Sequence, residues 1–131
     1  MEDGYHVVEF PNGGRFEGEI KDGMPNGLGM MIFPSGACYK GGFKDAGFHG
    51  LGVLYFADGD RSGVERKEGE FSDDVFQTGI QWTQGDPIYF ENGVYVISIP
   101  SPFIDENARK QKIENAREKA LLATNHILEL I

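Results

Sequence analysis

Four side chains in the sequence, three histidines and one cysteine, are of the types that most often catalyse reactions or bind metals. His6, His49 and His126 fall on three different predicted elements and lack the short spacing that metal ligands share. Cys38 has no sequence neighbour that suggests a catalytic pair, and we expect its thiol to be a packing group. A single cysteine cannot form an internal disulfide, which fits a reducing, cytoplasmic compartment.

Two kinds of motif imitate ligand-binding loops without completing them. The segment 58–63 begins like an EF-hand calcium loop, but Gly69 stands where that loop requires a bidentate glutamate, and its flanks read as strands. The Gly-x-Gly pairs at 27–29 and 50–52 lack the third glycine and the strand-to-helix context of a nucleotide-binding loop. We therefore predict no catalytic residue, no metal site and no cofactor, and we expect that the protein is not an enzyme.

The net charge of −9 lies entirely in the first 104 of the 131 residues, because the segment 105–131 carries five acidic and five basic residues. An acidic body repels phosphate groups, so nucleic-acid binding is disfavoured, and so is binding to anionic lipid. The basic surface that a membrane could use lies in the C-terminal segment: Arg109, Lys110, Lys112, Arg117 and Lys119.

All nineteen glycines lie between Gly4 and Gly93, and many of them follow a 23-residue repeat. Shifting the chain by 23 residues superimposes aromatic, apolar and glycine positions: Phe16 on Tyr39, Gly18 on Gly41, Ile20 on Phe43, Gly27 on Gly50, Gly29 on Gly52, Phe33 on Phe56 and Gly36 on Gly59. The same shift backwards identifies a partial copy at 4–14 before the full copies at 15–36 and 38–59. A degenerate copy at 67–98 aligns after a five-residue insertion.

The repeating unit resembles the MORN (membrane occupation and recognition nexus) repeat. It reads aromatic-x-Gly-x-apolar, then a turn, then Gly-x-Gly-x-x-x-aromatic-x-x-Gly. The matching positions are expected to be structural: Phe16, Gly18, Gly23, Gly27, Gly29, Phe33, Gly36, Tyr39, Gly41, Phe43, Gly50, Gly52, Phe56 and Gly59. Ile20 and Phe43 stand where the family prefers tryptophan, and Ala46 replaces a usual glycine. The resemblance implies a non-catalytic interaction module; short MORN chains of this kind are common in cilia, flagella and other cytoskeletal assemblies.

The residue pattern predicts a β-hairpin for each repeat. Residues 16, 18 and 20 alternate with polar neighbours, which is the pattern of a strand with one buried face. Asp22-Gly23 is a turn-forming pair and precedes a second strand at 27–33. The paired glycines of that second strand leave room for a neighbouring aromatic ring. One hairpin is marginal alone, so the hairpins should stack into an open, elongated antiparallel sheet over 1–98, giving a mainly β protein.

A different pattern begins after the last glycine. Residues 99–104 form a proline-containing linker, Asp105 is a good helix N-cap, and 105–131 is predicted to be an amphipathic helix. Its apolar stripe, which includes Ile113, Ala120 and Ile127, widens near the end of the chain. The helix can dock on its own sheet or on a partner protein, and we favour the partner.

The apolar residues on both faces of the predicted sheet suggest partner binding, because a single helix cannot cover two faces. Candidate partner-binding residues are Met30, Ile32, Tyr55, Trp82, Ile113, Ala120, Ile127, Leu128, Leu130 and Ile131. The predicted function is a non-catalytic protein–protein adaptor, with cytoskeletal or axonemal subunits as partners and a cytoplasmic, ciliary or cytoskeletal location. A peripheral membrane module that binds phosphoinositide and a regulatory subunit of a separate enzyme are the alternatives.

Overall fold

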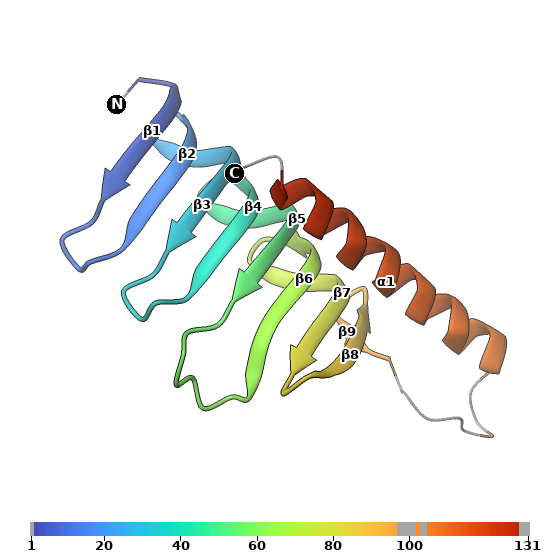
Figure 1. Cartoon of the computed structure of the whole chain (residues 1–131). Helices are drawn as coiled ribbons and strands as arrows, with labels where there is room; N and C mark the ends of the chain where they lie inside the picture. The colour runs from blue at the N-terminus through green and yellow to red at the C-terminus, as the bar shows by residue number, and fades with distance from the viewer. Residues whose placement is uncertain (1, 97–101, 103–104, 129–131) are drawn as a thin grey trace.

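The computed structural model describes residues 2–96, 102 and 105–128, and in these residues nine strands form one open sheet (Figure 1). Every neighbouring pair is antiparallel, and the strands follow in sequence order. The elements are β1 (Gly4–Glu9), β2 (Arg15–Lys21), β3 (Met24–Ile32), β4 (Cys38–Lys44), β5 (Gly47–Tyr55), β6 (Val64–Ser72), β7 (Val75–Thr83), β8 (Asp86–Glu91), β9 (Val94–Tyr95) and α1 (Glu106–Leu128). The predicted mainly β fold with one C-terminal helix is confirmed.

Five two-residue turns each join the two strands of a β-hairpin, and both residues of each turn have positive φ. They are Asp22-Gly23, Asp45-Ala46, Asp73-Asp74, Gln84-Gly85 and Asn92-Gly93. Positive φ at both positions is what a type I′ turn requires, and the twist of such a turn matches that of the flanking strands. The turn expected at Asp22-Gly23 is therefore present, and the four later hairpins repeat it.

One face of the sheet, called the aromatic face, holds most of the core. Phe16, Tyr39 and Phe71 are almost completely buried there, and the rings of Tyr39 and Phe48 stack with centroids 3.9 Å apart. Glycine is necessary opposite these rings, since a Cβ built on Gly52 would lie 2.2 Å from the Tyr39 hydroxyl oxygen. The predicted role of the paired glycines, to make room for an aromatic ring, is confirmed at this position.

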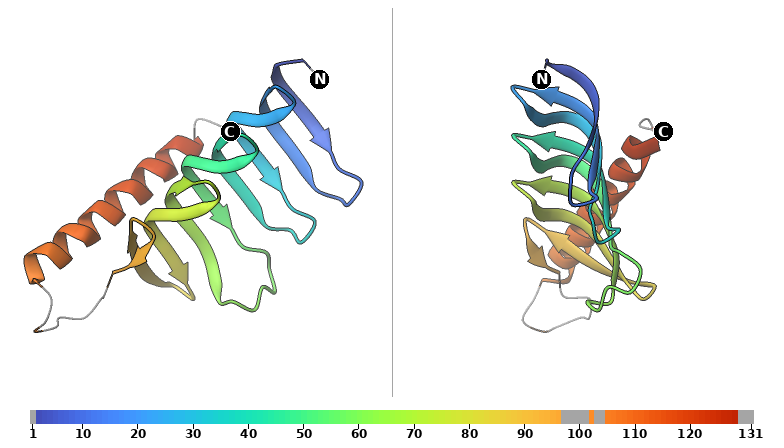
Figure 2. Two further views of the ribbon diagram at one scale, coloured as in Figure 1. Left: turned by 180° about the vertical axis from the view of Figure 1, so that it is seen from behind. Right: turned by 90° about the vertical axis from the view of Figure 1, so that its left-hand side faces the viewer.

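The helix α1 packs along the opposite face, called the helix face, and runs back from β8 towards β4 (Figures 1 and 2). The expectation that the helix docks on a partner protein is therefore wrong. Three alanines are the physical reason: Ala116, Ala120 and Ala123 are buried and let the helix axis approach the strands closely. The second apolar face is covered by the chain itself over β4–β8.

The start of α1 follows the sequence prediction, but the exposure of its last turns does not. The Asp105 carboxylate accepts a hydrogen bond from the backbone N–H of Asn107 at 2.9 Å, as an N-cap does. Leu121 is 62% exposed, and Leu122 is also exposed, so they do not widen the packed stripe as expected. The buried stripe is narrow and consists of alanines followed by Ile127.

Candidate interaction surface

The helix face is defined by the strand register. Successive side chains of a strand alternate between faces, and directly paired residues share one. The pairs Met30–Lys40, Lys40–Val53 and Val53–Glu68 place one row of side chains across β3 to β6. This row continues through Ile80 on β7 to Tyr89 on β8. The helix face is thus a mixed surface on which apolar and charged residues alternate across the sheet.

The C-terminal part of this face carries the seat of α1, formed by Leu51 and Val53 of β5. Ala123 and Ile127 pack on these two residues, which leaves Val53 only 1% exposed. Ala123 and Ile127 are four residues apart, so they lie on the same side of the helix. The seat therefore accepts one small and one large aliphatic side chain from successive turns.

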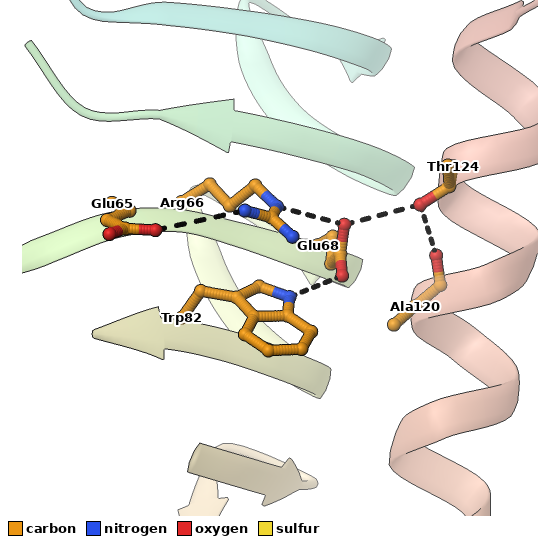
Figure 3. A network of polar contacts seen from close by, with 6 residues as sticks. All are labelled: Glu65, Arg66, Glu68, Trp82, Ala120 and Thr124. Atoms are coloured by element: carbon orange, nitrogen blue, oxygen red, sulfur yellow. Dashed lines mark hydrogen bonds and ion pairs between the residues drawn. The ribbon is translucent and has the colours of Figure 1, made fainter. Parts of the chain in front are cut away.

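A polar network joins the seat to the helix beside these apolar contacts (Figure 3). The Glu68 carboxylate of β6 accepts hydrogen bonds from the Trp82 indole N–H at 2.5 Å and from the Thr124 hydroxyl group at 3.3 Å. Arg66 adds an ion pair to Glu68 at 3.4 Å and stacks over the Trp82 ring at 4.8 Å. Because Glu68 is half-buried, these partners replace the water that its charge loses.

Further polar contacts fix α1 on β6 and β8. The Lys119 ammonium group pairs with Glu70 at 3.1 Å, the Arg117 guanidinium group donates to the Tyr89 hydroxyl oxygen at 3.3 Å, and Asn115 donates to Glu91 at 3.2 Å.

Three of the five basic residues of the segment 105–131 form ion pairs or hydrogen bonds within the chain: Lys119 with Glu70, Arg117 with Tyr89 and Glu114, and Arg109 with Glu106. The hydrogen bond between Arg109 and Glu106, aided by their opposite charges, raises the pKa of Arg109 and lowers the pKa of Glu106. Lys110 and Lys112 are exposed. Part of the basic charge of the helix is therefore paired with acidic side chains of the same chain.

The N-terminal part of the helix face is different, because the main contacts of α1 end at β4. Tyr5 and Val7 of β1 are 64% and 50% exposed there. A hollow of about 260 Å³, called the N-terminal groove, opens between the walls formed by Tyr5, Glu17, Leu28, Met30 and Lys40. Gly18 and Gly29 form its floor. The Tyr5 hydroxyl group donates to the Glu17 carboxylate at 2.9 Å, and this hydrogen bond raises the pKa of Tyr5.

The predicted partner-binding residues divide into three groups. Met30, Ile32 and Tyr55 lie on the helix face outside the seat, half-buried or exposed. Ala120 and Ile127 are buried within the chain, Trp82 belongs to the Glu68 network, and Ile113 is half-buried on α1. Leu130, Ile131 and the side chain of Leu128 lie outside the described residues.

Sequence reasoning missed Tyr5, Glu68 and Thr124. A signal for Glu68 existed, because Glu68-Gly69-Glu70 repeats Glu17-Gly18-Glu19 and so marks both segments as the same position of the repeat. The contact of Thr124 with Glu68 joins residues 56 positions apart and has no local signal. Tyr5 gave none because the partial copy at 4–14 contains few repeat positions.

The residues that first suggested chemistry belong to no metal-binding cluster among the described residues. Within the described part of the chain, no three histidine, cysteine, aspartate or glutamate side chains are placed to hold a metal ion. The Asp60 carboxylate accepts hydrogen bonds from the Ser62 hydroxyl group and from the Ser62 backbone N–H within its own loop, and these bonds lower the pKa of Asp60. Cys38 is half-buried, and this burial raises the pKa of its thiol, which disfavours the reactive thiolate. No helix among the described residues combines the length and apolar character needed to cross a membrane.

A comparison with known families finds one type of repeat in this chain. The MORN repeat model matches residues 16–38 and 39–61, so the chain contains two consecutive MORN repeats, as the sequence resemblance implied. These two copies correspond to the hairpins β2–β3 and β4–β5. A comparison with curated proteins finds none that matches this chain. MORN repeats are non-catalytic modules that generally mediate protein or membrane interactions.

Proposed function

We propose that this protein is a non-catalytic adaptor that binds another protein through the N-terminal part of its helix face. The observation that carries the proposal is the contrast along this one face, where α1 buries the C-terminal part while Tyr5 and Val7 remain exposed beside the N-terminal groove. Exposed tyrosine next to an apolar hollow is typical of protein-binding surfaces.

The cellular setting belongs to the same proposal. We propose cytoskeletal or axonemal subunits as the partners and a cytoplasmic, ciliary or cytoskeletal location, which the MORN repeats support. A membrane role gains little support from the helix, because ion pairs and hydrogen bonds within the chain engage Arg109, Arg117 and Lys119.

Co-purification of the full chain from cells, followed by mass spectrometry, tests the proposal. We expect specific proteins to be recovered with the unaltered chain and with a Val75→Lys control, in which the changed residue is exposed at the tip of the β6–β7 hairpin. A parallel sedimentation with vesicles that contain phosphatidylserine and phosphoinositide should leave the protein in solution. Salt-sensitive recovery with the vesicles, without a protein partner, would contradict the adaptor function.

A further inference from the structure

The repeat duplicates the seat of α1 at the N-terminal groove. A shift of 23 residues places Leu28 on Leu51 and Met30 on Val53, the two residues that receive Ala123 and Ile127 of α1. The same shift places the floor glycines Gly18 and Gly29 on Gly41 and Gly52. The N-terminal groove therefore has the backbone shape and the apolar pair of a surface that already binds a helix in this molecule.

The groove is continuous with that interface but lies one repeat further along the sheet. Neighbouring strands are about 4.8 Å apart, so one two-stranded repeat displaces the site by about 10 Å. The main contacts of α1 are with β4–β8, whereas the walls of the groove come from β1–β4. Because α1 crosses the strands from β8 towards β4, a second helix in the groove avoids α1 by extending from the groove towards β1 (Figure 1).

The charges beside the apolar pair restrict the occupant. Glu17 pairs with Met30 on one side, and Lys40 pairs with Met30 on the other. At the seat, the acidic neighbours Glu68 and Glu70 bind a hydroxyl group and an ammonium group of the helix. The groove reverses the order of charges, because Lys40 pairs with Met30 on the side where Glu68 pairs with Val53 at the seat. A helix in the groove would therefore place an acidic or polar side chain towards Lys40 and a donor towards Glu17, which already accepts a hydrogen bond from Tyr5.

We infer that the N-terminal groove binds an amphipathic α-helix of a partner protein, an inference that rests on the proposed adaptor function. The helix presents a small residue and, four positions later, a large aliphatic residue to Leu28 and Met30, as Ala123 and Ile127 do at the seat. On the flank that faces Glu17 it carries a lysine, an arginine or a hydroxyl group. The chain's own helix thus identifies the apolar residues of the partner helix, and Glu17 and Lys40 identify its charged ones.

A labelled synthetic peptide of residues 105–128, added to the full chain, tests this inference with a probe of known sequence. We expect saturable one-to-one binding in fluorescence anisotropy that Met30→Lys weakens at least about tenfold. Tyr5→Lys, at an exposed position where folding should be retained, should weaken it as well. Val75→Lys is the matched control and should bind like the unaltered chain. A peptide with leucine in place of Ala120 and Ala123 should not bind, because the larger side chains prevent close approach.

Four results of the peptide and sedimentation measurements would overturn the inference. The first is no saturation at millimolar peptide, and the second is binding that Met30→Lys and Tyr5→Lys leave unchanged, which would indicate exchange with α1 on its seat. The third is self-association in sedimentation that Met30→Lys abolishes, which would assign the groove to a second copy. The fourth is binding only to a chain that ends at Leu128, which would assign it to residues 129–131. If the Met30→Lys chain still recovers its partner from cells, the adaptor function stands and the groove is not its site.

Discussion

At the scale of single residues, the turn at Asp45-Ala46 departs from the sequence that its backbone favours. Ala46 has a φ of 70° in a position where the MORN repeat usually has glycine. An L-residue in this left-handed region costs about 1–2 kcal/mol, and only part of this is offset by the greater flexibility of unfolded glycine. The backbone N–H of Ala46 donates to the Pro25 carbonyl oxygen at 3.0 Å, a bond that glycine would keep.

Ala46→Gly should therefore raise the free energy of unfolding by about 0.5–1 kcal/mol. Asp74→Gly is the matched control, because Asp74 has the same φ of 70° but its carboxylate accepts a hydrogen bond from the Phe48 N–H at 2.8 Å. Loss of that bond, about 1 kcal/mol, should cancel the gain. Urea denaturation measures both variants, and a less stable Ala46→Gly protein would contradict the strain argument.

Tyr39 gives the aromatic face a dependence on alkaline pH. Its side chain is fully buried and its hydroxyl group donates to the Gly42 carbonyl oxygen at 2.9 Å. Burial, with a smaller effect of the Asp74 charge, raises the pKa of Tyr39 far above its ordinary value of about 10. Above that pH the unfolded chain loses a proton that the folded chain keeps, so stability falls as the pH rises.

Tyr39→Phe should remove this slope. Near neutral pH the variant should be less stable by about 1 kcal/mol, because one hydrogen bond is lost. Above about pH 10, the free energy of unfolding falls with pH in both proteins, but the decrease should be smaller in the variant. The difference between the two slopes should reach up to about 1.4 kcal/mol per pH unit. Urea denaturation at several pH values from about 8 to about 11 compares the two slopes. Parallel curves would show that Tyr39 is not the group responsible.

The strand spacing and the turn conformations could be predicted from the sequence because they depend on neighbouring residues. The spacing of Phe16, Gly18 and Ile20 follows the two-residue period of a strand, and positive φ at Gly23 follows from turn chemistry. The hydrogen bonds that hold α1 could not be predicted in this way. Glu68 and Thr124 are brought together by the path of the whole chain and not by neighbouring residues.

At the scale of elements, the existence of α1 was predictable and its docking was not. Asp105 and the run without glycine or proline identify the helix from local preferences alone. Whether α1 docks on its own sheet or on a partner depends on the presence of a complementary surface close to it in the folded chain. The sequence pattern contains no information on that surface. The alanine stripe fits either dock, and its fit to Leu51 and Val53 is visible only in three dimensions.

Ile127→Asp tests this docking directly. Ile127 is 6% exposed in the seat, so an aspartate there should lower stability by about 3 kcal/mol or more. Trp82, the single tryptophan, bonds to Glu68 beside Thr124, so its fluorescence should also shift as the helix leaves. The control Leu121→Asp changes an exposed residue of the same helix and should alter stability by no more than about 0.5 kcal/mol. An unchanged melting temperature for Ile127→Asp would show that α1 does not stabilise the sheet.

At the scale of the whole molecule, the helix divides an otherwise uniform repeat sheet into two parts. In a stack of repeats each unit contacts only its neighbours, so stability is close to a sum of local contributions. The helix α1 adds long-range contacts, but mainly to β4–β8. The strands β1–β3 depend on sheet pairing and on the aromatic face. The proposed binding surface therefore lies on the part of the molecule with fewer stabilising contacts.

Amide hydrogen exchange should reveal this division as two levels of protection. We expect amides of β5–β7 to exchange more slowly than those of β1–β2, by up to about a hundredfold if α1 contributes about 3 kcal/mol. Ile127→Asp should then speed exchange in β5–β7 while leaving β1–β2 nearly unchanged, because only the former lie under the helix. Uniform protection that falls uniformly in the variant would indicate one cooperative unit. Two levels would indicate that the N-terminal hairpins can open and adjust to a partner while α1 holds the rest of the sheet.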